Sequence, residues 1–368
     1  MAKTSEYGLG AFVYPRGWFM VADAAQVTHE PKAVRFFGQE LVLYRGRTSG
    51  RVVLLDAFCP HMGTHLARNT TSYVVRSGEQ VDGDSIRCPF HRWRFGPDGR
   101  CNEIPYSTAP IPPSARIRSW RVVEIMGAVF AWHDPENGDP DYEIPVLAEW
   151  DDPAWVRWTF DDLGVLACHP QEVVDNIVDA AHQAPVHGQD LIYFENEFLG
   201  HRVVQREGGI SKTALSASDE VLSIDATYHG PAVLISGLGG RYPSYFLICH
   251  TPVDDGSIQV WHALTMKAAS ATVTPDDIAT ARAFQALSLE AFAQDFDLWR
   301  NKRPATQILQ IVDDGPYHKL RQWYRQFYNP RSRVAELTRG VDGRYGIRGM
   351  PRTLAEARNR DETSSRDQ

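Results

Sequence analysis

Several features that mark common protein classes are scarce in this chain of 368 residues. It has only five cysteines, an odd number, which favours reduced thiols or metal ligands in a cytoplasmic protein over a disulfide framework. No apolar run approaches the roughly 20 residues that cross a bilayer. The N-terminus lacks a basic start followed by an apolar stretch, so we expect neither a transmembrane segment nor a secretory signal.

Concentrated positive charge and nucleotide-binding motifs are also missing. The 38 basic and 46 acidic residues give a formal net charge of -8, and no basic block is present, so we expect no nucleic-acid partner. The chain has no GxGxxG or other flavin or nicotinamide signature. A redox function would therefore take its electrons from a separate protein.

The composition predicts two folded domains. Apolar residues make up 43% of the chain, which is ample for packed cores. Short β-branched and aromatic runs separated by turns predict an antiparallel all-β domain over residues 1–145, ending in a linker rich in proline, glycine and acid at 134–145. Residues 146–350 mix helical and strand patterns and form the second predicted domain. Residues 351–368 are predicted to be a polar tail that is frayed over residues 358–368.

Two short motifs in the first domain combine thiols with imidazoles. Cys59 and His61 are one residue apart, and Cys88 and His91 are separated by two residues. Each pair follows a strand-like run, so two loops present four ligands to one centre. Two thiolates and two imidazoles suit zinc, or a two-iron cluster with the cysteines on one iron and the histidines on the other.

A second set of candidate ligands follows the start of the second domain. Asn176, Asp179 and His182 are spaced three residues apart, so on a helix they share one face. If His182 binds a metal ion, Asn176 is expected to lie near that ion. Pro185 is expected to break that helix just before His187, which lets the two imidazoles converge. Asp179 is placed to accept the ring N–H of His182 and fix its tautomer.

A mononuclear iron site with two histidines needs a carboxylate as its third ligand. A long helix is predicted to begin with Thr274 as N-cap and Pro275 in the first helical position. Asp295 interrupts its apolar stripe, where an unpaired carboxylate is costly, whereas Asp297 lies on the opposite, solvent-facing side. The pattern therefore selects Asp295. Trp299, one turn later on the same face, is either a core aromatic or part of a substrate pocket.

The motif Cys-x-His followed by Cys-x-x-His resembles that of the Rieske domain family. The resemblance implies that a [2Fe–2S] cluster is bound by Cys59, His61, Cys88 and His91. Where respiratory Rieske proteins carry two further cysteines, this chain has Thr64 and Phe90, which indicates the oxygenase or ferredoxin branch. The 26 residues 62–87 between the motifs exceed the usual number, and we interpret the excess as an extended hairpin.

The second set resembles the pattern of Rieske non-heme iron oxygenases, Asp-x-x-His-x-x-x-x-His plus a distant aspartate. It is matched by Asp179, His182, His187 and Asp295. The resemblance implies mononuclear Fe(II) that activates O2 with electrons from the cluster. These electrons originate in NAD(P)H and arrive through a reductase or ferredoxin. It also implies a homotrimer in which Asp179 stands between His91 of one chain and His182 of the next.

Three further segments, at residues 103–106, 294–303 and 313–330, resemble the family of 3-ketosteroid 9α-hydroxylase oxygenase components. This implies a hydrophobic polycyclic substrate such as a steroid. We expect an α+β chain, with an all-β Rieske domain and a catalytic domain of helix-grip type, an antiparallel sheet with helices on one side. The alternatives are an oxygenase for aromatic or dealkylated substrates, a non-enzymatic electron carrier, and a zinc-stabilised binding module.

Overall fold

The computed structural model describes residues 2–212 and 220–359 and divides the chain into two compact units. The Rieske unit is Trp18–His133, and the catalytic unit contains the residues before and after it. The division differs from the predicted domain boundary at residue 145, because residues 2–17 and 134–145 belong to the catalytic unit. No helix of the described residues combines the length and apolarity needed to span a membrane.

The predicted linker at 134–145 is packed rather than free. Asp134 is buried, and its carboxylate pairs with the guanidinium of Arg331 at 2.7 Å. The ring of Tyr142 stacks on that of His201, with centroids 4.4 Å apart. The linker interpretation is therefore wrong, since prolines and glycines here give an extended segment that is bound along its length.

The Rieske unit is built from three antiparallel sheets and has an all-β core, as predicted. The sheets are β1-β10-β9, β2-β3-β4 and β5-β6-β7-β8. Their strands are β1 (Gly17–Asp23), β2 (Lys32–Phe36), β3 (Gln39–Arg45), β4 (Val52–Asp56), β5 (Val81–Asp82), β6 (Ser85–Arg87), β7 (Arg94–Phe95), β8 (Cys101–Glu103), β9 (Val122–Ile125) and β10 (Ala128–His133). The one 3-10 turn is η2 (Ala24–Gln26) and the one helix is α1 (Tyr73–Arg76), counted over this wholly described unit.

Helix α1 corrects the interpretation of the long gap between the two ligand motifs. The side chain of Asn69 accepts hydrogen bonds from the backbone of Thr71 and Ser72, a turn that starts the helix. Gly78, with a φ of 73°, follows the helix and redirects the chain into β5. The excess is therefore a short helix and a two-residue strand, not an extended hairpin.

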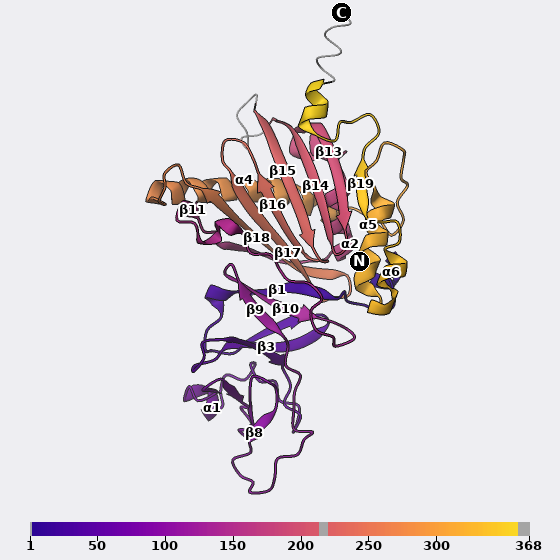
Figure 1. Cartoon of the computed structure of the whole chain (residues 1–368). Helices are drawn as coiled ribbons and strands as arrows, with labels where there is room; N and C mark the ends of the chain where they lie inside the picture. The colour runs from indigo at the N-terminus through magenta and orange to yellow at the C-terminus, as the bar shows by residue number, and fades with distance from the viewer. Residues whose placement is uncertain (1, 213–219, 360–368) are drawn as a thin grey trace, which may run out of the picture. The chain divides into compact units, whose positions relative to one another are not determined.

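The catalytic unit contains one nine-stranded antiparallel sheet (Figure 1). Its order is β11-β18-β17-β16-β15-β14-β13-β19, with β12 also pairing with β18. The strands are β11 (Trp155–Val156), β12 (Phe160–Leu166), β13 (Gln189–Leu199), β14 (Arg202–Ser211), β15 (Val221–His229), β16 (Val233–Leu238), β17 (Ser244–Asp254), β18 (Ser257–Lys267) and β19 (Gly343–Gly346). Hairpins join β13 to β14 and β17 to β18, so consecutive long strands are neighbours.

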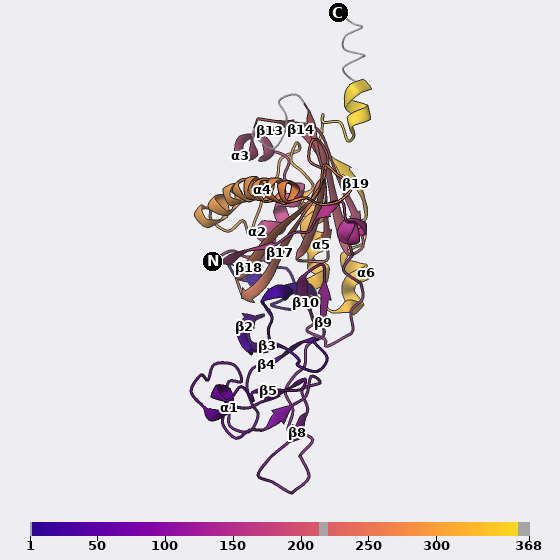
Figure 2. The same ribbon diagram turned by 90° about the vertical axis from the view of Figure 1, so that its left-hand side faces the viewer.

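Helices cover one face of this sheet, as predicted, and Figure 2 shows α4 (Pro275–Asn301) along it. The others are α2 (Pro170–Val174), α3 (Gln183–His187), α5 (Tyr317–Tyr324) and α6 (Val334–Leu337), with the 3-10 turns η1 (Thr4–Tyr7), η3 (Ala148–Asp151), η4 (Asp175–Val178), η5 (Arg325–Tyr328) and η6 (Arg331–Arg333). Phe292 and Trp299 of α4 pack on Ile248 and Val260 of the sheet. This contact closes a cavity between helix and sheet.

Helix α4 begins as its sequence predicts. Thr274 is the N-cap, and its hydroxyl accepts the N–H of Asp277 while the Asp277 carboxylate accepts the N–H of Thr274. Part of the segment predicted as a polar tail is folded. Residues 354–359 are helical with Ala357 buried, and residues 360–368 lie outside the described residues.

Candidate metal centres and substrate cavity

The two ligand loops of the Rieske unit share one backbone design. In the loop after β4, the N–H of Gly63 donates to the carbonyl of Cys59 at 2.9 Å, and in the loop after β6 the N–H of Arg92 donates to that of Cys88 at 3.0 Å. The fourth residue after each cysteine has a positive φ, 71° at Gly63 and 63° at Arg92. A positive φ is uncommon for a residue with a side chain. Each cysteine–histidine pair thus lies on the same tight turn.

Burial separates the thiols from the imidazoles. Cys59 and Cys88 are 2% and 1% exposed, whereas His61 is exposed and His91 is half-buried. The two rings lie 4.7 Å apart between centroids. A hydrogen bond with Cys59 lowers the pKa of the Cys88 thiol to about 6 and raises that of Cys59. Paired inner sulfurs and paired outer nitrogens match an asymmetric two-iron cluster.

A single zinc ion fits these four residues poorly. Tetrahedral zinc, with bonds of about 2.0–2.3 Å, would hold all four ligand atoms within about 4 Å of one another. Among the described residues, only one group brings three or more such atoms within 4.8 Å, and it is His182, His187 and Asp295. The division into a thiol pair and an imidazole pair therefore favours two irons over one zinc.

The segment that carries the second set of ligands is not one helix. Helix α2 passes into η4, Asp179 has an extended backbone with φ −92° and ψ 92°, and α3 begins only after His182. The prediction that Pro185 breaks a helix is also wrong. Pro185 is the third residue of α3, where its missing N–H has no helical partner to lose. The turn at Asp179, not the proline, brings the two histidines together.

The structure places His182, His187 and Asp295 side by side: the histidines stand at the two ends of α3, and the aspartate comes from α4. Nε2 of His187 lies 3.4 Å from Oδ2 of Asp295, and the two imidazole centroids are 5.1 Å apart. Asp295 is 6% exposed on α4, while Asp297 is exposed and accepts a hydrogen bond from Asn301. Two imidazoles and a carboxylate on one face of a site are the donor set of non-heme Fe(II) enzymes.

Neighbouring side chains orient both imidazoles. Nδ1 of His187 donates to Oε1 of Gln294 at 2.9 Å, and Nδ1 of His182 lies 3.6 Å from Oδ2 of Asp179. The hydrogen bond to Gln294 holds the ring proton of His187 on Nδ1 and leaves its Nε2 for a metal, whereas Asp179 faces Nδ1 of His182 from just beyond hydrogen-bond distance. Gln294 has no part in the sequence prediction. The only feature of the sequence that points to Gln294 is its position directly before Asp295. The hydrophobic periodicity of the helix does not distinguish this amide from other polar residues.

Asp179 is held by several contacts. Its Oδ1 accepts the N–H groups of Ala181 and His182 at 3.1 and 3.3 Å. Burial raises its pKa, but hydrogen bonds with His182 and Tyr317 outweigh burial and lower the pKa overall. The side chain is still 27% exposed. It lines a cavity next to the metal-ligand triad, which we call the Asp179 cavity.

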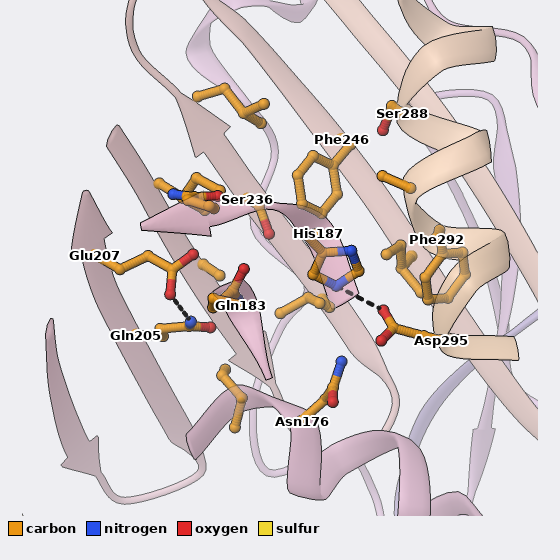
Figure 3. A pocket seen from close by; sticks show the side chains of 18 of the residues that line it. Asn176, Gln183, His187, Gln205, Glu207, Ser236, Phe246, Ser288, Phe292 and Asp295 are labelled. Carbon is orange, nitrogen blue, oxygen red and sulfur yellow. Dashed lines mark hydrogen bonds and ion pairs between the residues drawn. The ribbon is translucent and has the colours of Figure 1, made fainter. Parts of the chain in front are cut away.

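A second cavity, which we call the substrate cavity, is also lined by the triad and lies between the sheet and α4 (Figure 3). It encloses about 1060 Å³, including its open mouth. Asn176, predicted to lie near the metal, and Trp299, predicted as a core or substrate-pocket aromatic, both line the two cavities. Trp299 is only 8% exposed and packs on Phe292 and Phe296. It therefore belongs to the core and also lines the substrate cavity.

Comparison with known proteins identifies both units. The Rieske [2Fe-2S] domain model matches residues 17–121, and the model of the 3-ketosteroid 9alpha-hydroxylase C-terminal domain matches residues 131–328. A probable 3-ketosteroid-9-alpha-monooxygenase oxygenase component of Rhodococcus rhodochrous is 35% identical over 345 residues, 89% of this chain and 83% of the relative. A Mycobacterium tuberculosis relative with the same enzyme name is 32% identical over 86% of this chain and 82% of its own.

Solved structures share the fold. Dicamba monooxygenase bound to 3,6-dichlorosalicylic acid has a TM-score of 0.67 at 19% identity, over 89% of this chain and 98% of its own. The chain is thus an oxygenase component, not a simple electron carrier or a zinc-stabilised binding module. It uses a [2Fe–2S] cluster, non-heme iron and O2, and a separate reductase supplies its electrons. These findings together show that the chain belongs to the 3-ketosteroid 9α-hydroxylase family of Rieske oxygenases.

Proposed function

We propose that this oxygenase hydroxylates a steroid or a closely related polycyclic substrate in the substrate cavity. The observation that carries the proposal is that the triad of His182, His187 and Asp295 forms part of the wall of a largely apolar cavity (Figure 3). Burial of apolar surface contributes about 25 cal/mol per Å². A rigid polycyclic skeleton therefore gains several kcal/mol there without a charged group. The relatives named as 3-ketosteroid monooxygenases support this substrate class.

In this proposal the triad holds Fe(II), and the two Rieske loops hold the cluster through Cys59, His61, Cys88 and His91. When bound, the cluster supplies electrons and the iron activates O2. The protein's own side chains orient the ligand imidazoles, position the substrate and exclude water. Gln294 and Asp179 keep the imidazole protons away from the metal side. Phe246 and Phe292 present apolar walls that seat the substrate and exclude water.

We further propose a homotrimer, because the predicted cluster ligands and the triad belong to different units of the chain. A head-to-tail contact closes into a ring. In such a ring Asp179 stands between His182 and His91 of the partner subunit, and its carboxylate couples the two imidazoles. The partial exposure of Asp179, in a cavity that adjoins the triad, supports this role.

A ferredoxin-type reductase or a ferredoxin would deliver the electrons, which originate in NAD(P)H. We propose that this takes place in the cytoplasm. All five cysteines are free in the structure, and two of them are needed as thiolates in the cluster. A reducing compartment preserves such thiols.

The test is a substrate panel with a surrogate reductase. The metal-loaded enzyme is offered 3-ketosteroids, steroid acyl derivatives and small aromatic acids, and O2 uptake is compared with product formed. We expect steroids to bind with micromolar affinity and to give nearly one product per O2. Turnover of aromatic acids together with failure of every steroid to bind would assign the enzyme to another substrate class.

A further inference from the structure

One polar patch breaks the apolar wall of the substrate cavity away from the metal-ligand triad. Gln205 and Glu207 are two residues apart on β14, so their side chains point to the same face. They are 7% and 1% exposed, and Nε2 of Gln205 donates to Oε2 of Glu207 at 2.6 Å. Among the described residues, no lysine or arginine lies within 4.0 Å of the Glu207 carboxylate. A single amide is a weak partner for a buried carboxylate.

Strand β16, which is separated from β14 by β15, adds a polar group without a partner. Oγ of Ser236 is buried, lines the same cavity and has no hydrogen-bond partner among the described residues. The register places Gln205 opposite Ala226 and Ala226 opposite Ser236, so all three side chains share one face of the sheet. An unsatisfied hydroxyl of this kind costs about 1–3 kcal/mol when nothing binds it.

The position of the patch relative to the triad is visible in Figure 3. Glu207 and Gln205 project from the sheet on one side of the cavity, and Asp295 projects from α4 on the other, with His187 between them. Burial raises the pKa of Glu207 to about 7. The amide of Gln205 and the charges of His182 and His187 act against burial and lower this pKa. A carboxyl group accepts a hydrogen bond when ionised and can donate one when protonated, and the amide of Gln205 adds a carbonyl and an N–H group.

We propose that Glu207 and Gln205 form a recognition site for a carbonyl or hydroxyl oxygen at one end of the substrate. The inference rests on the proposed function and deepens it. An oxygen bound at β14 holds one end of a rigid skeleton at the sheet, and the skeleton's length then determines which carbon reaches His182, His187 and Asp295. Glu207 is accordingly a specificity-determining and positioning residue, and it takes no part in the chemistry.

The test measures binding of matched ligands to the metal-loaded enzyme without O2. The ligands are a steroid with an oxygen at each end and two analogues that lack one oxygen each. Glu207→Leu should weaken binding of the full ligand and of one analogue by about 10- to 100-fold. It should leave the other analogue, which lacks the oxygen bound at β14, within about twofold of wild type. Under turnover the same variant should form less product per O2 and shift the position of hydroxylation.

Glu195→Gln is the matched control. Glu195 is a buried glutamate on β13 that pairs with Arg206 and does not line the cavity. It should leave ligand preference unchanged. Equal weakening of all three ligands by Glu207→Leu would show a purely structural role and overturn the inference. Failure of wild type to bind any steroid would overturn the proposed function and the recognition site with it.

Discussion

Ligand and non-ligand carboxylates lie only two residues apart on α4. Asp295 faces His187 from the buried side of the helix, whereas Asp297 is exposed and bonds to Asn301. We expect Asp295→Ala to lose the mononuclear iron and turnover while it keeps the cluster spectrum. Asp297→Ala should keep both metals, as measured by iron content and EPR. The opposite pattern would show that the ligand assignment is wrong.

A similar comparison is available among the buried cysteines of the Rieske unit. Cys88 touches Cys59, whereas Cys101 belongs to the same core and its thiol contacts the carbonyl of Glu103. Cys88→Ser or His91→Ala should abolish the charge-transfer absorption and the reduced-state EPR signal of a histidine-ligated cluster. Cys101→Ser should retain both signals. Retention in either ligand variant would contradict the proposed ligand set.

Residues with a fixed spacing or an unusual chemical type could be predicted from the sequence, and residues that act by position could not. His182, His187 and Asp295 stand out because imidazoles and a buried carboxylate are rare on apolar faces. Gln294 and Glu207 are ordinary residue types for a helix and a strand. Their roles depend on which side chains the fold places opposite them.

At the scale of elements, the predicted iron ligands lie close together although the single helix predicted to carry two of them is not formed. A three-residue recurrence of polar groups between apolar ones is shared by a continuous helix and by a helical turn followed by a 3-10 turn. Sequence periodicity cannot separate the two over so short a segment. The extended residue at Asp179 ends the helical run, yet it still turns His182 toward His187.

Glu172 of α2 ties three elements of the catalytic unit together. Its carboxylate accepts the hydroxyl of Tyr7 at 2.5 Å and the N–H of Ala305 at 2.8 Å, and it pairs with Lys302 at the end of α4. Burial raises its pKa, but the bonds from Lys302 and Tyr7 outweigh burial and lower the pKa overall. Glu172→Gln should destabilise the unit by about 1–2 kcal/mol, because Lys302 is partly exposed and its interaction is screened.

The lowered pKa gives this contribution a definite pH dependence. The stabilisation is present above the unfolded pKa of 4.5 and is lost as the pH falls through the lower folded value. The difference in unfolding midpoint between wild type and Glu172→Gln should therefore shrink below pH 4.5. Glu336→Gln, in an exposed pair with Arg333, should behave like wild type throughout. A constant difference at every pH would exclude the ionic explanation.

For the whole molecule, the proposed trimer makes Asp179 a link between subunits. Asp179→Asn should keep both metals and the trimer, but it should slow electron transfer by orders of magnitude. The rate of cluster oxidation in a single turnover measures this step. An unchanged rate would restrict Asp179 to its contact with His182.

Mixed trimers test the same arrangement directly. Chains with His91→Ala lack the cluster, and chains with His182→Ala lack the mononuclear iron. Co-expressed, they should regain part of the activity, since one intact cluster then meets one intact iron across a subunit boundary. Full turnover by a protein that is monomeric in light scattering would contradict the trimer.

Long-range contacts were the least predictable feature. The segment at 134–145 has the composition of a flexible connection, yet Asp134 pairs with Arg331, 197 residues later. The composition of a short segment cannot predict a contact with a residue so distant in the sequence. The same limit applies to the N-terminal residues, which sequence reasoning assigned to the Rieske domain and which pack in the catalytic unit.

The Rieske unit is therefore an insertion within the catalytic unit, and this has a consequence for biosynthesis. The backbone of Phe12 and Arg16 donates to the carbonyls of Tyr328 and Phe327. Translation at about 5–20 residues per second leaves roughly 15–60 s between the synthesis of these partners. During that interval residues 18–133, which form one compact unit, are already synthesised. The backbone contacts of Phe12 and Arg16 with residues 327–328 can form only afterwards, so we expect the Rieske unit to fold before the catalytic unit is completed.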